Sequence, residues 1–404
     1  MQFQDVLGQQ EVKQHLAEMV QHNRLSHALL FLGREGAGAL PLALAFAQYI
    51  VCEKVANKAA AAGPSLFGEA PAADQQSTLN DSCGECPACT KAAQLVHPDI
   101  HFSYPVVTKK AGSPPISADY ISDWREFVQQ YPYGNVYDWL QAIGADNKQG
   151  NITAQECNDI IRKLNLKSFE SGHKILILWM PEYLGKEGNK LLKLIEEPPA
   201  DTLFILVAEN ESQILSTILS RCQLVKIPAL DTTAVEQALI TRNSCAPDAA
   251  KRLANISEGN YREALQLLQH ADEDFHALLR DWLNATLKNQ PIAQVKVVEE
   301  ISRLGRENQK QFLRYFTHLL EQAIKLKVLQ GAAREALLEA LSQNEQDFAL
   351  RLNKAASLEQ QQAIVEELDK AAYYIERNAN AKILFHALTI KMFHIIKNNI
   401  VLLA

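Results

Sequence analysis

A glycine-rich loop at residues 33–40 has the spacing of a phosphate-binding P-loop but lacks the reactive end of that motif. The motif G-x-x-x-x-G-K-[ST] uses its lysine to reach the β- and γ-phosphates and its hydroxyl to coordinate magnesium. Its lysine and hydroxyl positions here hold Ala39 and Leu40, after the glycines Gly33, Gly36 and Gly38. An alanine carries no charge, and a leucine cannot ligate a hard cation. The sequence therefore predicts a degenerate P-loop, and we assign no nucleotide-binding residue to it.

The acidic pair that phosphate hydrolysis needs is missing as well. After the strand predicted at 174–178, an aspartate would hold magnesium and an adjacent glutamate would polarise water. The chain instead reads Trp-Met-Pro-Glu at 179–182, where Glu182 is the only carboxylate. We interpret Glu182 as a solvated residue at a helix start. Because Glu35 also adds negative charge inside the glycine loop, we expect no hydrolysis by this chain.

Four cysteines have the spacing of a metal site. Three of them recur at two-residue intervals, Cys83, Cys86 and Cys89, and Cys52 lies at the end of the helix predicted after the glycine loop. Four thiolates close a tetrahedral zinc site without an open position for substrate, so the predicted role is structural. Core thiols without a metal are one alternative. An iron–sulfur cluster is another, although the ferredoxin motif requires a cysteine where this chain has Ala93.

An arginine follows the strand predicted at 203–207. It belongs to the tripeptide Ser220-Arg221-Cys222, which comes after a predicted helical turn. An isolated arginine in such a place is most often a surface salt-bridge partner. Next to another subunit's P-loop it could instead act in trans as an arginine finger on the γ-phosphate. The residues themselves leave both interpretations open.

Buried strands that alternate with helices would position these groups. A capping-box pair, Thr153 and Glu156, predicts a helix that starts at 154. Another helix is predicted at 41–54, where Pro41 suits a first turn. Short continuous apolar runs predict parallel strands at 28–32, 174–178, 203–207 and 224–227. The first 228 residues therefore read as a parallel α/β sheet.

The remainder of the chain reads as helical. From about residue 275, apolar residues recur at helical spacing with almost no glycine or proline, which predicts long amphipathic helices. At 404 residues the chain exceeds the usual size of a single core, so two to three domains are expected.

Composition and charge limit the classes of function. A hydrophobic content of 47% and a charged content of 22% are ordinary for a globular protein. The net charge of -7 argues against binding nucleic acid through a broadly basic surface. The N-terminal residues do not resemble a signal peptide and no apolar run is long enough to span a bilayer, so we expect a cytoplasmic protein without a membrane partner.

Six stretches together carry a resemblance to a known family. They include Glu-Glu-Pro-Pro at 196–199 and Ser-Arg-Cys at 220–222, in this order and in a chain with the four cysteines. The stretches lie at 3–9, 26–33, 97–100, 189–199, 218–222 and 259–265. On these residues, the chain resembles a clamp-loader subunit of the AAA+ class over most of residues 1–268.

The resemblance implies a non-catalytic subunit of the DNA polymerase III clamp loader. In that family, a ring of five subunits, with ATP-binding motor subunits and a delta subunit, loads the sliding clamp onto primed DNA. By the same resemblance Arg221, flanked by Ser220 and Cys222, would enter the ATP site of an adjacent motor subunit. Arg262 takes the position of a nucleotide-sensing arginine and would keep a structural role here. The implied structural zinc has the ligands Cys52, Cys83, Cys86 and Cys89.

The resemblance also implies the order of the domains. An AAA+ P-loop-type α/β domain would occupy 1–228, with an inserted zinc module at about 52–95. A small helical lid domain would follow at 229–272, and an all-α collar domain for oligomerisation at 273–404.

Two features depart from the family's usual pattern. The spacing between Cys52 and the other three cysteines is much longer than usual, which makes Cys52 the least secure ligand. A segment at about 105–150 has no counterpart, and we interpret it as a surface elaboration. Its aromatic residues are Tyr131, Tyr133, Tyr137 and Trp139.

Two other functions stay open. One is an active motor ATPase of the gamma/tau type with unusual residues, against which Ala39, Leu40 and Trp179 argue. The other is a zinc-dependent module that binds nucleic acid, against which the acidic balance of the chain argues.

Overall fold

The computed structural model describes most of the chain, and its contacts divide the chain into two compact units, Met1–Gln266 and Leu267–Ala404. The residues outside the description are 57–80, 110–111, 113, 146–147, 270–274, 342, 377–378 and 399–404. Most of the segment that links Cys52 to Cys83 therefore lies outside the described residues.

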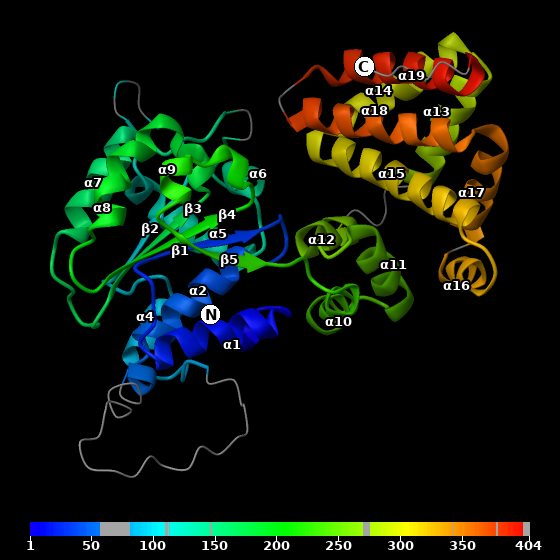
Figure 1. The fold of residues 1–404 in the computed structure, drawn as a ribbon. Helices are drawn as coiled ribbons and strands as arrows, with labels where there is room; N and C mark the ends of the chain where they lie inside the picture. Colours follow the sequence, from blue (N-terminus) through cyan, green and yellow to red (C-terminus); the bar gives the residue numbers. More distant parts are fainter. Residues whose placement is uncertain are drawn as a thin grey trace. The chain divides into compact units, whose positions relative to one another are not determined.

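A five-stranded parallel sheet forms the centre of the first unit (Figure 1). The strands are β1 (Ala28–Gly33), β2 (Ile100–Ser103), β3 (Lys174–Trp179), β4 (Thr202–Ala208) and β5 (Gln223–Ile227). Their order across the sheet is β2-β3-β4-β1-β5, and every pairing is parallel. The predicted α/β class and its four predicted strands are confirmed. The strand β2 is absent from the predicted elements, because its four residues form no continuous apolar run.

Helices cover both faces of the sheet (Figure 1). Besides the short 3-10 turns η1 (Phe3–Asp5), η2 (Ser117–Tyr120) and η4 (Glu211–Gln213), they are α1 (Gln10–Gln21), α2 (Ala39–Val51), α4 (Pro87–Ala93), α7 (Ala154–Leu164), η3 (Pro181–Leu191), α8 (Leu192–Glu196) and α9 (Ser216–Leu219). Side chains alternate along each strand, so Phe31 and Ile177 pack with α1, α2 and α4, whereas Leu30 and Leu176 pack with α7, η3, α8 and α9. The helix α7 begins at Ala154 as predicted.

The 105–150 segment contributes to the core of the first unit. It contains α5 (Ile121–Gln130) and α6 (Val136–Ala142). The side chains of Trp124 and Trp139 are both 0% exposed, and the Trp124 ring lies 5.1 Å from that of Trp179, at the end of β3. The interpretation of this segment as a surface elaboration is therefore wrong, because Trp124 and Trp139 complete the core beside the sheet.

Three helices follow the last strand. They are α10 (Thr232–Asn243), α11 (Pro247–Ser257) and α12 (Tyr261–Gln269). The first two lie in the first unit, and the division between the units falls inside α12. A lid at 229–272 that is separate from the sheet domain stays a prediction.

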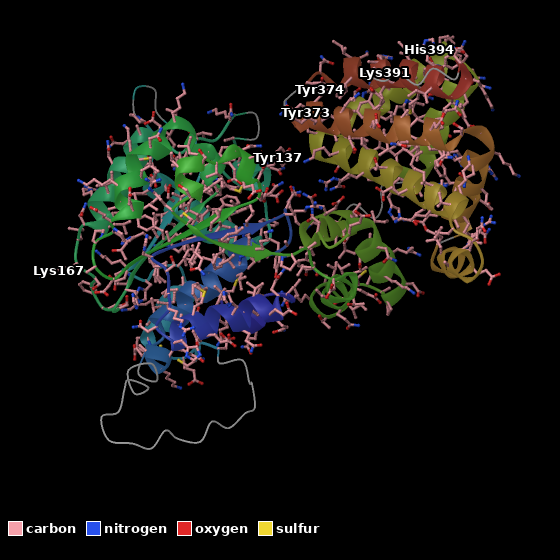
Figure 2. All side chains as sticks on the ribbon, in the orientation of Figure 1. Tyr137, Lys167, Tyr373, Tyr374, Lys391 and His394 are labelled. Atoms are coloured by element: carbon pink, nitrogen blue, oxygen red, sulfur yellow. The ribbon has the colours of Figure 1, made fainter. Side chains whose placement is uncertain are left out.

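The second unit is helical and has its own core. Its helices are α13 (Phe275–Leu287), α14 (Pro291–Arg303), α15 (Arg306–Val328), α16 (Ala332–Ala340), α17 (Gln343–Ala355), α18 (Leu358–Glu376) and α19 (Ala381–Asn398). The long helix α15 packs against α17 and α18. Trp282 is fully buried and donates a hydrogen bond to Thr389 on α19 (2.9 Å). At the edge of this core, Lys391 on α19 (Figure 2) pairs with Glu367 on α18.

Among the described helices, none is both long enough and apolar enough to cross a bilayer.

Candidate functional site

The glycine loop joins β1 to α2, as the P-loop spacing predicts. Gly36 and Gly38 have φ angles of +72° and +92°, in the left-handed region that glycine adopts without strain. Gly38 is the residue that caps α2. Ala39 and Leu40 are buried in the first turn of that helix, at the positions where a lysine and a hydroxyl would serve a nucleotide. The loop therefore combines left-handed glycines with buried apolar side chains at the start of α2.

The mouth of this loop is filled by the chain itself. A Cβ added to Gly38 would lie 3.0 Å from Cε1 of Tyr133, which belongs to the segment between α5 and α6. Tyr133 is 5% exposed, and its hydroxyl accepts a hydrogen bond from the backbone N–H of Leu7 (2.8 Å). Burial raises the pKa of Tyr133 to about 12. The cavity that remains at the loop is about 20 Å³, which is room for about one water molecule.

A buried charge cluster lies beside the loop. Arg262 on α12, with a side chain 4% exposed, forms a bidentate pair with Asp138 on α6 through Nε and Nη2 (2.5 and 2.6 Å). Its Nη1 donates to Glu35 of the glycine loop (2.8 Å). Asn135 also donates to Glu35, through Nδ2 (3.0 Å). Arg262 thus has two carboxylates as partners, and the structural role that the resemblance implies for it stays a prediction.

At the end of β3, apolar side chains occupy the positions where phosphate hydrolysis would need two acidic residues. Trp179 is buried against α5, and Met180 has a φ of +59°. Glu182 lies in the first turn of η3, as interpreted, but the expectation that it is solvated is wrong. Its Oε1 accepts hydrogen bonds from the backbone N–H groups of Glu209 and Asn210 (2.7 and 2.9 Å), and burial raises its pKa. Glu182 therefore fixes the turn after β4.

Arg221 lies directly after α9, on the surface of the first unit. Its side chain is 31% exposed and pairs with Glu196 at the end of α8 (Nη2 to Oε2, 3.1 Å). Its Nη1 donates to the carbonyl of Thr217 (2.9 Å). The neighbouring Ser220 hydroxyl also donates to that carbonyl (3.2 Å). Burial raises the pKa of the Cys222 thiol to about 11, so this thiol behaves as a packing group.

The four predicted metal ligands lie together. The sulfur atoms of Cys52, Cys83, Cys86 and Cys89 are all within 4.8 Å of one another. Cys52 ends α2, and Cys86 caps α4, so the ends of two helices hold the cluster. The long interval after Cys52 therefore does not remove it from the group.

The cluster has the geometry and hydrogen bonding of a thiolate site. Four sulfurs around one zinc ion lie about 3.8 Å apart, and the Sγ atoms of Cys83 and Cys89 are 3.9 Å apart. Three backbone N–H groups donate to sulfurs of the cluster, which stabilises thiolates. Burial raises the pKa of both Cys83 and Cys89; hydrogen bonds outweigh burial at Cys83 and lower its pKa to about 6, but not at Cys89. The spacing of the four sulfurs and their N–H donors fit a bound metal ion.

Sequence reasoning missed the residues that close the loop. The N-cap Asn135 and Asp138 form a local capping box, so a search for helix starts would find them as structural residues. Their contacts with Glu35 and Arg262 join positions about a hundred residues apart, and no local pattern shows such a pairing.

Comparison with known proteins places the chain. The sequence model of a family described as "DNA polymerase III, delta subunit" matches residues 8–66 and 64–231. The DNA polymerase III subunit delta' of Bacillus subtilis is 26% identical over 260 residues, which are 64% of this chain and 59% of that protein. The delta' subunit of Pseudomonas aeruginosa is 27% identical over 70% of this chain and 67% of its own length.

A tau/gamma subunit also matches. That of Haemophilus influenzae is 24% identical over 67% of this chain and 30% of its own length. The chain thus spans less than two thirds of this relative and of the Bacillus subtilis protein. The family match covers more than half of the chain, and we conclude that the chain belongs to the DNA polymerase III, delta subunit family of clamp-loader proteins.

Proposed function

We propose that this protein is a clamp-loader subunit without ATPase activity of its own, which supplies Arg221 to the ATP site of a neighbouring subunit. Its partners would be the motor subunits and the delta subunit of a five-membered ring. The ring would load a sliding clamp onto primed DNA with the energy of ATP. The observation that carries the proposal is a partly exposed guanidinium in a chain whose own glycine loop is closed.

The chemistry of Arg221 supports a role in trans. A guanidinium stabilises the charge that develops on the γ-phosphate during transfer, whichever subunit provides it. Arg221 is anchored through Nη1 to the carbonyl of Thr217, so its head is held close to the surface. Its second partner, Glu196, is 58% exposed, and an exposed ion pair of this kind contributes little stability. A phosphate group could therefore replace Glu196 at small energetic cost.

Reconstitution with the motor and delta subunits tests the proposal. We expect Arg221→Ala to lower DNA-stimulated ATP hydrolysis at the adjacent site by up to about 10³-fold, and to slow clamp loading, with assembly intact. Arg252→Ala, at an exposed arginine on α11, is the matched control and should behave as wild type. Unchanged ATPase and clamp loading in Arg221→Ala would show that the proposal is wrong.

The alternative is an active motor subunit of the gamma/tau type, which the match to the tau/gamma subunit favours. The two functions differ in what the isolated chain binds. We expect no binding of labelled ATP at micromolar concentration, because Ala39 and Leu40 replace the groups that hold phosphate and magnesium. Micromolar affinity together with turnover would establish the motor subunit instead.

We also propose that the four-cysteine cluster holds a structural zinc ion. Such an ion would tie the end of α2 to the start of α4. Four thiolates would leave it no open coordination position, so it would take no part in catalysis.

A further inference from the structure

Two segments of the chain lie against the glycine loop. Asn260, just before α12, contacts Gly36: a Cβ on Gly36 would lie 1.9 Å from its Oδ1. Tyr133, between α5 and α6, lies against Gly38. The backbone N–H of Tyr261 also donates to the carbonyl of Gly36 (3.3 Å). The space over the loop is thus already used by groups of this chain.

The charged side chains beside the loop also disfavour a bound phosphate. Glu35 and Asp138 approach Arg262 from different segments, and their side chains are only 21% and 18% exposed. The three groups together carry one net negative charge. A phosphate in this place would have to displace a carboxylate from a buried bidentate pair, which is among the strongest polar contacts in proteins.

The same groups connect the sheet to the helices that follow it. Arg262 and Tyr261 begin α12, whereas Glu35 belongs to the loop after β1. The rings of Tyr133 and Tyr261 meet edge to face with centroids 5.0 Å apart. The Tyr261 hydroxyl donates to Asn243 at the end of α10 (2.9 Å). One cluster therefore joins the glycine loop, the 131–138 segment and the helices α10 and α12.

We propose that the 131–138 segment is a permanent intramolecular occupant of the glycine-loop site, and that its Asp138 shares with Glu35 the role of counter-charge to Arg262. In a nucleotide-binding site, a phosphate can supply that counter-charge, so the position of the neighbouring helices depends on the ligand. Here two carboxylates of the chain supply it. The helices α10–α12 are then fixed on the sheet without any nucleotide. This inference rests on geometry alone and does not require the proposed action of Arg221.

Hydrogen–deuterium exchange of the full chain tests whether Asp138 fixes the helices α10–α12 on the sheet. Asp138→Asn keeps the shape of the side chain and removes its charge. We expect exchange within residues 232–266 to become about tenfold faster, since a charge-assisted contact is lost and these helices open locally more often. Asp123→Asn is the matched control, because Asp123 lies exposed on α5, 3.8 Å from Lys109. It should exchange as wild type.

A second variant and a ligand complete the experiment. If the contact is direct, Asp138→Asn combined with Arg262→Gln should exchange no faster in 232–266 than Arg262→Gln alone. Magnesium ATP should not protect residues 33–40 of the wild type. Unchanged exchange in Asp138→Asn, an acceleration that extends equally through β1–β5, or protection by magnesium ATP would each overturn the proposal.

Discussion

Asp99 is a buried residue whose carboxylate holds the backbone of residues 169–171, shortly before β3. The backbone N–H groups of Phe169, Glu170 and Ser171 donate to its two oxygens at 2.5, 2.9 and 2.8 Å. Its own backbone carbonyl accepts from Ile175, so it joins the start of β2 to the start of β3. Burial raises the pKa of Asp99, but the three N–H donors outweigh burial and lower it below 3.8. The charged form is therefore part of the fold.

Removal of this charge should weaken the first unit. We expect Asp99→Asn to lower the free energy of unfolding at pH 7 by about 2 kcal/mol, because three backbone N–H groups lose a charged acceptor. The folded pKa lies below the unfolded value, so the contribution of Asp99 is complete above about pH 4 and is lost as pH falls further. The difference between variant and wild type should therefore shrink below pH 4.

Urea unfolding at pH 7, 5 and 3.5 measures this difference. Tryptophan fluorescence reports mainly the first unit, which holds three of the chain's four tryptophans, Trp124, Trp139 and Trp179. Asp123→Asn, at an exposed carboxylate, should change little. If Asp99→Asn were as stable as wild type at pH 7, the three hydrogen bonds would not contribute as described.

At the scale of elements, the sequence predicts those strands and helix starts that are determined by residues close together in the chain. The apolar runs of β1, β3, β4 and β5 and the N-cap of α7 are local signals, and the structure confirms them. The four-cysteine cluster was also predictable. Two residues separate each neighbouring pair among Cys83, Cys86 and Cys89, so these three thiols lie close together, and Cys52 remained as the candidate for the fourth ligand. The closure of the glycine loop was not predictable. It depends on Tyr133 and Asp138, whose partners are distant in sequence and are selected by tertiary packing.

The cysteine cluster connects α2 with α4, and its metal content can be tested. We expect purified protein to contain about one zinc ion per chain, and Cys52→Ser to lower that content because a tetrahedral site loses one of four ligands. Loss of the ion should also speed hydrogen exchange at the end of α2 and in α4, since binding energy is folding energy. Metal analysis under reducing conditions measures the content.

Cys245→Ser is the control for this variant. Cys245 is buried but lies outside the cluster, so its replacement should leave the zinc content unchanged. A wild-type metal content near zero would remove zinc from the proposal. Equal zinc in Cys52→Ser and wild type would remove Cys52 from the ligands.

At the scale of the whole molecule, each unit has its own hydrophobic core, and the core of the first unit consists of two clusters, one on each face of the sheet. The core of the first unit positions the glycine loop, Arg221 and the cysteine cluster. Among the residues that the structure describes, the core of the second unit is built from its own helices and includes Trp282, Phe312 and Phe385, whose rings pack within 6.4 Å of one another. This suits the proposed collar, whose part would be to join subunits.

The self-contained core of the second unit predicts independent folding. We expect residues 275–404, expressed alone, to show a helical circular dichroism spectrum and one cooperative thermal transition, because a domain with a complete core can fold by itself. In that fragment Phe312→Ala should lower the free energy of unfolding by about 3–5 kcal/mol, as Phe312 is 0% exposed. Ile292→Ala, at a side chain 89% exposed, should cost little. A fragment that melts without cooperativity, or equal effects of the two substitutions, would show that this unit depends on the rest of the chain for its structure.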